Sequence, residues 1–140
     1  MMENNLEDYK INIRIKLSAL WTAIMFCYIY GDYFELYIPK KVEGLLSGQN
    51  MLDSPMKLLL ATFILAIPAL MIFLSLVLST KFTKWLNIAV GVFFTLFTML
   101  VGISSLTQWR AFYVLLALIE SVLTATVVVM AWRWPKIKVE

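Results

Sequence analysis

The 140-residue chain is 61% hydrophobic and only 15% charged, and its mean hydropathy is +0.82. This composition excludes an ordinary soluble globular domain and indicates a membrane protein. The formal net charge is +3, but the basic residues lie beside apolar runs and form no basic face, so we expect no nucleic acid partner. Because the chain has no His and only one cysteine, Cys27, we expect no metal site, no cofactor and no thiol-redox or zinc catalysis.

Four apolar stretches are each close to the ~20 residues that cross a bilayer. They predict an all-α fold, an antiparallel four-helix bundle integral to the membrane, with the whole chain forming a single transmembrane domain. The predicted spans cover about 17–38, 56–78, 85–106 and 110–132.

The segment before the first span, "MMENNLEDYKINIRIK", contains Glu3, Glu7 and Asp8. No Ala-x-Ala pattern follows the apolar run, so the sequence argues against a cleaved signal peptide. We expect this segment to lead into the first span as a helix whose Arg14 and Lys16 side chains reach the membrane surface.

The stretch "YIYGDYFELYIP", residues 28–39, places two acids in the second half of the first span. Residues 17–31 alone would cover only about 22 Å, so we expect the helix to continue to Ile38. Asp32 and Glu35 then lie below the membrane surface and share one helix face with Tyr28. Because acids that face lipid are costly, we expect both to face the bundle interior or a water-filled pocket. The alternative is a pair of solvated acids at a frayed helix end.

The longest connection covers residues 39–54. It lies across the mouth of the bundle as a lid, or it rests at the membrane interface as an ordinary loop. Asp53 or Ser54 is the expected N-cap of the second span, with Pro55 in its first turn. Pro68 leaves the carbonyl of Ile64 without its helical hydrogen bond, which predicts a kink that opens room at mid-depth.

A stripe of small and polar residues recurs at three- and four-residue steps along the third span. This small-residue stripe favours close packing against another helix of the chain, with an interface for a partner protein as the alternative. Its members are Asn87, Gly91, Thr95, Thr98, Gly102 and Ser105.

Glu120 lies near the middle of the fourth span, where its side chain cannot reach the membrane surface. Such an acid costs roughly 3 kcal/mol on insertion, which the apolar residues around it offset. Tyr113 and Thr124 share its face, so we expect a pair of hydroxyls to hold the carboxyl group, either in a binding or proton-handling site or in a polar clasp between helices. Arg110 begins the span, and we expect it to pair with Glu35 as a staple or as part of an anion-and-cation pocket.

The Lys and Arg residues are divided unequally between the two ends of the predicted bundle, which predicts cytoplasmic termini. Eight lie on the side of the termini and four on the other side. The eight are Lys10, Arg14, Lys16, Lys81, Lys84, Arg133, Lys136 and Lys138; the four are Lys40, Lys41, Lys57 and Arg110.

A cluster around the first acid pair, followed by "VEGLLSG", resembles a bacterial membrane family of unknown function and, more distantly, the DoxX-like four-helix proteins. The cluster comprises Gly31, Asp32, Tyr33, Phe34, Glu35 and Pro39. The resemblance covers nearly the whole chain and implies a location in the bacterial inner membrane, but it implies no activity. Lys40 stands where such proteins often carry Gly. At fold level the chain is also similar to proteins of the sterol-isomerase and sigma-receptor type, which place acids inside a small bundle that binds hydrophobic amines.

Together these features predict a membrane protein, surrounded by lipid, whose acid-lined pocket binds a small amphiphile, including a cationic one. A proton-coupled transport component is the first alternative, and it would need a homodimer because four spans are few for alternating access. A structural or assembly subunit is the second, and an enzyme that uses an acid pair is the third, although no residue is predicted to be catalytic. The predicted site residues are Tyr28, Asp32, Glu35, Arg110, Tyr113 and Glu120.

Overall fold

The first long helix begins where an asparagine caps it. The computed structural model describes residues 9–136, and helix α1 (Ile13–Glu35) starts after Asn12, whose side chain accepts a hydrogen bond from the amide of Arg14 at 2.9 Å. The helical lead-in is therefore present from Ile13 onwards, and α1 starts four residues before the predicted span.

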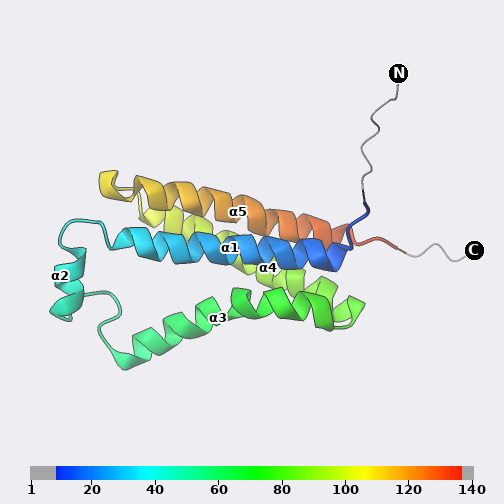
Figure 1. Ribbon diagram of the computed structural model, residues 1–140, viewed down its shortest axis with the longest axis horizontal. Helices are drawn as coiled ribbons and strands as arrows, with labels where there is room; N and C mark the ends of the chain where they lie inside the picture. Colours follow the sequence, from blue (N-terminus) through cyan, green and yellow to red (C-terminus); the bar gives the residue numbers. More distant parts are fainter. Residues whose placement is uncertain (1–8, 137–140) are drawn as a thin grey trace, which may run out of the picture.

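The prediction that this helix continues to Ile38 is wrong, because α1 ends at Glu35 and turns follow. Two residues explain the stop. Pro39 disfavours the helical conformation in the residue before it, and Lys40 adopts the left-handed conformation with φ 64°. The chain then forms the short helix α2 (Lys41–Leu46), which lies beyond the end of α1 and bridges the gap to α3 (Figure 1).

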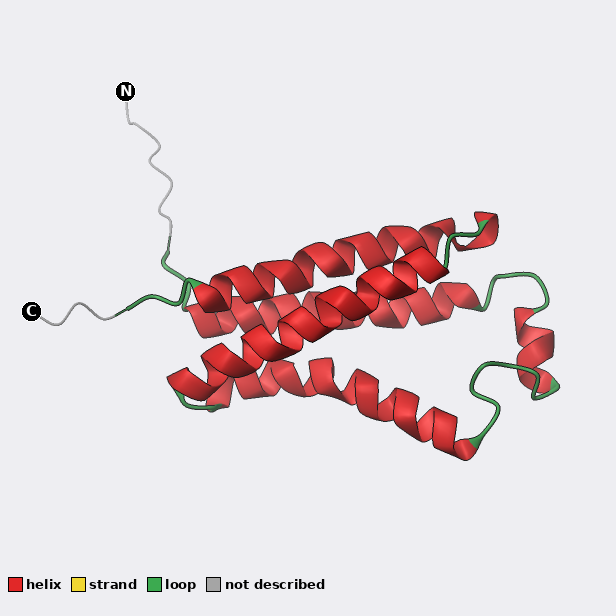
Figure 2. Cartoon of the chain, turned by 180° about the vertical axis from the view of Figure 1, so that it is seen from behind, coloured by secondary structure: helices red, strands yellow, loops and turns green. Residues whose placement is uncertain are grey.

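Helix α3 (Pro55–Val77) has the expected start, with Ser54 as its N-cap and Pro55 in the first turn. Asp53, the other candidate cap, pairs with Lys57 at 2.6 Å instead. As Pro68 predicts, α3 changes direction near its middle, and its first half diverges from the rest of the bundle (Figures 1 and 2). This divergence leaves one side of the bundle less tightly packed than the others.

Helices α4 (Thr80–Ser104) and α5 (Ala111–Trp132) pack closely along the small-residue stripe and are joined by the short 3₁₀ helix η1 (Gln108–Arg110). A Cβ atom on Gly91 would lie 2.7 Å from Cγ2 of Val128, and one on Gly102 would lie 3.0 Å from Cβ of Ala117. The absence of side chains at these two glycines is thus what lets the helices approach. Packing within the chain therefore accounts for the stripe, as predicted.

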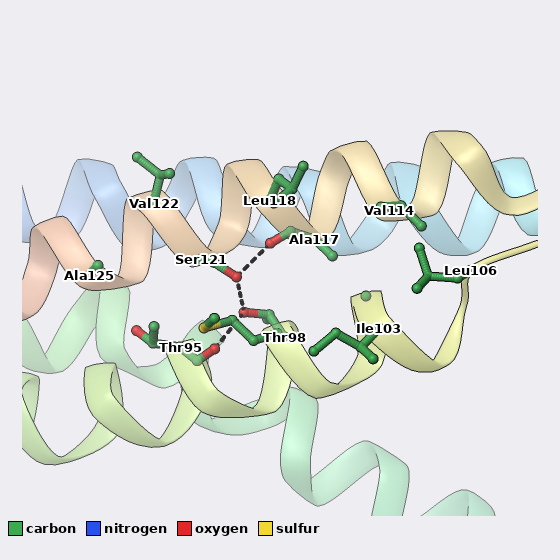
Figure 3. Close-up of a pocket in the computed structure, with 12 residues that line it drawn as sticks. Thr95, Thr98, Ile103, Leu106, Val114, Ala117, Leu118, Ser121, Val122 and Ala125 are labelled. Carbon is green, nitrogen blue, oxygen red and sulfur yellow. Dashed lines mark hydrogen bonds between the residues drawn. The ribbon is translucent and has the colours of Figure 1, made fainter.

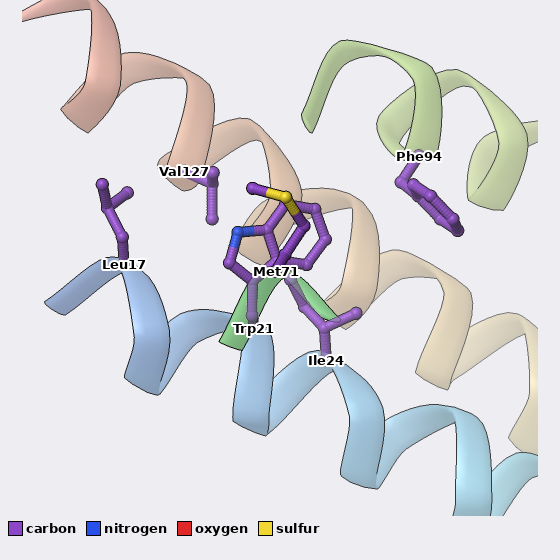
Figure 4. Packing of buried hydrophobic residues seen from close by; sticks show 6 residues of the cluster. All are labelled: Leu17, Trp21, Ile24, Met71, Phe94 and Val127. Carbon is purple, nitrogen blue, oxygen red and sulfur yellow. The ribbon is translucent and has the colours of Figure 1, made fainter. Parts of the chain in front are cut away.

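The apolar core lies in the half of the bundle where α1 begins and α5 ends, which we call the terminal end (Figure 4). Its six side chains come from all four long helices and are at most 1% exposed. Because lipid tails are as apolar as these side chains, van der Waals packing, rather than removal of apolar surface from water, fixes the mutual position of the helices here. The core comprises Leu17, Trp21, Ile24, Met71, Phe94 and Val127.

Arg14 has a different environment from the one expected. Its guanidinium donates hydrogen bonds to the backbone carbonyls of Leu76 at 3.1 Å and Leu78 at 2.6 Å, and to Oγ1 of Thr80 at 2.9 Å. These acceptors lie at the end of α3 and the start of α4, and the last carbonyls of a helix have no partner within that helix. The arginine thus joins α1 to the α3–α4 connection, whereas Lys16 is exposed.

The architecture confirms the all-α fold and the four-helix bundle. Residues 9–136 contain no strand, and four of their helical segments are long and apolar enough to cross a membrane. These segments are Ile13–Glu35, Pro55–Val77, Thr80–Ser104 and Gln108–Trp132. Their outer faces expose many large apolar side chains, as a lipid-facing surface does.

Candidate functional site

A cavity of about 200 Å³ lies among the four long helices, and we call it the acid cavity. Its α3 wall consists of residues that precede Pro68, so it occupies the region where the first half of α3 diverges. Four of the six predicted site residues line it. The full lining is Tyr28 and Asp32 of α1, Ala61, Ile64 and Leu65 of α3, Phe97, Thr98 and Val101 of α4, and Tyr113 and Glu120 of α5.

The α1 side of the acid cavity carries Tyr28 and Asp32, which are four residues apart and therefore share a face. The hydroxyl oxygen of Tyr28 is buried and has no hydrogen-bond partner. Leaving such a group unpaired costs about 1–3 kcal/mol. Asp32 is exposed, and no hydrogen bond or ion pair joins its carboxylate to the residues the structure describes. Both polar groups are thus available to a molecule in the cavity.

Gly31 lies where the two tyrosine-bearing helices, α1 and α5, pack against one another. It is buried, and a Cβ atom there would lie 3.4 Å from Cε2 of Tyr113 and 3.5 Å from Cδ1 of Leu116. These are ordinary van der Waals distances, so a methyl group would fit here. The glycine next to Asp32 therefore lies at the contact between α1 and α5, beside the ring of Tyr113, a placement that was not anticipated from the sequence.

Glu120 projects from the middle of α5 and is only 6% exposed. The prediction that hydroxyls of Tyr113 and Thr124 hold its carboxyl group is wrong. Thr124 instead donates to the backbone carbonyl of Glu120 at 2.9 Å and accepts from Oγ1 of Thr95 at 2.8 Å. A threonine in a helix reaches the carbonyl four residues before it more easily than a side chain on the next turn. In residues 9–136, the carboxyl group of Glu120 has no hydrogen-bond partner.

Glu35 and Arg110 do not line the acid cavity. The expected ion pair between them is present, with Nη2 of Arg110 2.8 Å from Oε1 of Glu35. Lys41 of α2 approaches the same oxygen, also at 2.8 Å. The carboxylate is 14% exposed and joins the end of α1 to α2 and to the start of α5. This geometry favours the staple over the anion-and-cation pocket, because both cations are already paired.

The acid cavity consequently has an unbalanced set of polar groups. It is lined by two carboxyl groups and by no Lys or Arg. Two carboxylates that line one small cavity repel one another when both are ionised. Within residues 9–136, no three His, Cys, Asp or Glu side chains are grouped as ligands of a metal ion. The arrangement can therefore receive hydrogen-bond donors or one cationic group of a ligand.

A second cavity, of about 360 Å³, lies between α4 and α5 and is almost entirely apolar (Figure 3). Its polar atoms are satisfied by the chain itself, since the hydroxyls of Thr98 and Ser121 lie 3.0 Å apart and Ser121 donates to the carbonyl of Ala117 at 2.7 Å. It contains no titratable group. This α4–α5 groove was missed in the sequence, where its signal is the four-residue spacing of Ala117, Ser121 and Ala125.

Comparison with known proteins supports membership of one family and gives no activity. A search of curated proteins and a search of solved structures found no match to the chain. A family described as a family of unknown function (DUF6326) matches residues 5–139, which is nearly the full length. The chain therefore belongs to the DUF6326 family of unknown function, as a small all-helical protein with four candidate membrane spans.

Proposed function

We propose that this protein binds one small amphiphile, with the polar group of the ligand between Asp32 and Glu120 in the acid cavity. The observation that carries the proposal is the buried hydroxyl of Tyr28, which lines the cavity and has no hydrogen-bond partner. Buried polar groups without a partner are rare in folded proteins and need an explanation. A ligand that reaches Tyr28 and the two carboxyl groups supplies one.

The charge of the lining favours a ligand with a cationic polar group. No basic residue lines the acid cavity, and the nearby Lys41 and Arg110 are both paired with Glu35. An ammonium group would offer donors to the carboxylates and would be attracted to the faces of the tyrosine rings. Among the described residues, no Lys or Arg forms an ion pair with Asp32 or Glu120, so the proposed ligand supplies that pairing charge.

The size of the cavity limits what it encloses. Ligand pockets of drug size usually measure roughly 300–1,000 Å³, whereas the acid cavity measures about 200 Å³. It therefore encloses the polar group and a short apolar part. The rest of an amphiphile extends between α1 and the diverging half of α3, where apolar side chains such as Ile64 and Leu65 provide the wall.

The proposal includes a location. We place the protein in the bacterial inner membrane with both termini in the cytoplasm, because the basic residues are more numerous at the terminal end. The acid cavity lies in the other half of the bundle, so its ligand enters from the outer leaflet. Helix α2 lies at that end but contributes no residue to the cavity lining. The prediction that the 39–54 connection acts as a lid is therefore independent of the proposal that the cavity binds a ligand.

Binding is favoured over transport by the position of the apolar core. The six core side chains lie between Glu120 and the terminal end, and they are at most 1% exposed. A proton or solute that passed from Asp32 through Glu120 would next meet this dry layer. Transport by a single chain would require the core to open, whereas binding requires no such change.

Mass spectrometry of small molecules released from the purified protein tests the proposal. The wild-type protein is compared with Asp32→Asn and Glu120→Gln, and with Glu43→Gln as the matched control. Glu43 is an exposed acid of α2 that does not line the acid cavity. We expect one defined molecule at close to one per chain in the wild type and the control. We expect at least a tenfold lower amount in the two cavity variants, because each loses a charge-assisted hydrogen bond worth about 1.5–3 kcal/mol.

Folding of each variant is checked by its helical circular dichroism and by its elution as one species in detergent. Mixed bulk lipid in equal amounts from all four proteins would contradict ligand binding. In that case a stoichiometric partner protein purified with the chain would support the assembly subunit. Proton-dependent flux in liposomes would support the transport component.

A further inference from the structure

The two ends of the bundle differ in charge in a way that the acid cavity does not explain. In the described part of the chain, no acid lies at the terminal end, where seven basic residues gather. Four of the five described acids lie in the opposite half, and Glu120 lies at mid-depth. The basic residues are Lys10, Arg14, Lys16, Lys81, Lys84, Arg133 and Lys136; the acids are Asp32, Glu35, Glu43, Asp53 and Glu120.

These cations are not neutralised within the described residues. All three ion pairs of residues 9–136 involve Glu35 or Asp53, at the opposite end. Arg14 is occupied by backbone carbonyls, but Lys16 and Arg133 have exposed side chains and no acidic partner. Among the described residues, the terminal end therefore carries a net positive charge, which favours anionic groups at the membrane surface.

Lys16 and Arg133 line one cavity of about 360 Å³ between the start of α1 and the end of α5, which we call the basic cavity. The rest of its wall is apolar and comes from these two helices and from the segments just before α1 and just after α5. No acid takes part in the lining. The five apolar residues are Ile11, Ile13, Val129, Met130 and Pro135.

The chemistry of this lining specifies an amphiphilic anion. An arginine presents a planar fork that matches phosphate oxygens, and a lysine adds a point charge. A free inorganic anion would make no contacts with the apolar wall. An acyl chain attached to the anion would cover that wall. Trp132 is exposed beside Arg133 in the sequence and contacts Trp85 edge to face, as interfacial tryptophans do.

We propose that the basic cavity binds the phosphodiester headgroup of an anionic phospholipid, with Lys16 and Arg133 on the phosphate and the acyl chain against the apolar wall. This site lies at the terminal end and shares no residue with the acid cavity. The proposal of a phospholipid site is therefore independent of the proposal that the acid cavity binds an amphiphile.

Native mass spectrometry of the full chain in detergent tests the site, with phosphatidylglycerol, phosphatidylcholine and inorganic phosphate as separate probes. We expect discrete adducts of phosphatidylglycerol on the wild type. The Lys16→Gln/Arg133→Gln variant should bind it roughly 25-fold more weakly, at about fivefold for each lost cation. The matched control is Lys81→Gln/Lys84→Gln, which removes two cations from the same end without touching the cavity lining.

The control variant should bind phosphatidylglycerol within about threefold of the wild type. An equal loss in both double variants would overturn the proposal, because it would show attraction by total charge alone. Equal binding of phosphatidylcholine would also overturn the proposal, because binding would then not depend on the negative charge of the lipid. Displacement of the lipid by inorganic phosphate would overturn it too, because binding would then not depend on contact between the acyl chain and the apolar wall.

A further variant keeps the test decisive if loss of both cations prevents folding. Val129→Trp leaves every charge in place and puts a larger side chain into the basic cavity, which Val129 lines. Val129 is 49% exposed, so the larger side chain can be accommodated without disturbing the core. We expect this variant to fold and to bind phosphatidylglycerol at least fivefold more weakly. Unchanged binding would show that the lipid lies elsewhere.

Discussion

Asn87 illustrates how single polar side chains hold these helices together. Its Oδ1 accepts a hydrogen bond from Nε1 of Trp21 at 2.8 Å, and its Nδ2 donates to the carbonyl of Thr83 at 2.8 Å and to Oγ of Ser75 at 3.2 Å. Because Asn87 is fully buried, none of these groups has water as a substitute. One amide thus connects α1, α3 and α4 at the level of the core.

We expect Asn87→Leu to lower the free energy of unfolding by about 1–2 kcal/mol, because Trp21 and Ser75 lose their partner while the volume of the side chain is kept. Denaturation with sodium dodecyl sulfate in mixed micelles measures the change. The control is Gln49→Leu, since Gln49 is an exposed amide before α3. If Asn87→Leu proves as stable as the control, the amide is not the connection that its distances indicate.

The residues of the acid cavity could be predicted in part because their spacing is local. Tyr28 and Asp32 are one helical turn apart, and mid-span position alone made Glu120 conspicuous. The partners of Arg14 could not be predicted in this way, because Leu76 and Leu78 are more than 60 residues away. The hydroxyl of Thr124 was assigned wrongly because spacing does not show that a backbone carbonyl is the nearer acceptor.

At the level of the helices, α3 differs from the others because it contains a proline inside the span. Its first half diverges from α1 (Figures 1 and 2), and that half supplies Ala61, Ile64 and Leu65 to the acid cavity. The volume of the cavity therefore depends on the direction change near Pro68. Straightening α3 should reduce it.

We expect Pro68→Ala to restore the hydrogen bond to the carbonyl of Ile64, to stabilise the protein by up to ~3 kcal/mol and to bring the start of α3 toward α1. Double electron–electron resonance between spin labels at Lys57→Cys and Tyr30→Cys measures the movement. Cys27→Ser removes the native thiol, so that only these two positions carry a label. Both labelled positions are exposed.

Pro55→Ala is the control for this change, because Pro55 lies at the first position of α3, where an amide has no helical partner. The distance between the labels should stay the same in the control and become shorter in Pro68→Ala. The amount of released ligand should fall in Pro68→Ala as well. A distance that is unchanged in Pro68→Ala would mean that packing, and not the proline, holds α3 away.

Helix existence was predictable from the sequence, and helix ends were less so. Ser54 with Pro55 gave the start of α3 to within one residue, because an N-cap is a local signal. The end of α1 was placed too late, since bilayer thickness argued for Ile38 while Pro39 and Lys40 end the helix at Glu35. Local backbone restrictions therefore outweighed the length requirement.

For the whole molecule, four spans place the start of α1 and the end of α5 at the same end of the bundle (Figure 1). The α3–α4 connection lies at that end, and α2 lies at the other. If the terminal end faces the cytoplasm, as the basic residues there predict, these two segments are accessible from opposite sides of the membrane.

We expect a membrane-impermeant maleimide to label Ser47→Cys in intact cells, and to label Lys81→Cys only after the membrane is permeabilised. Both residues are exposed, Ser47 after α2 and Lys81 at the start of α4. The background carries Cys27→Ser so that no other thiol reacts. The reverse pattern would invert the orientation and would place the mouth of the acid cavity on the cytoplasmic side.

The hydrogen bonds of Arg14 also have a consequence for the order in which the protein is made. Its acceptors belong to Leu76, Leu78 and Thr80, so none of them exists when α1 leaves the ribosome. The guanidinium of Arg14 therefore lacks these hydrogen-bond acceptors until more than half of the 140 residues have been synthesised. This connection at the terminal end therefore forms only after α3 and the first residue of α4 have been synthesised, and a nascent chain cut short before residue 76 cannot form it.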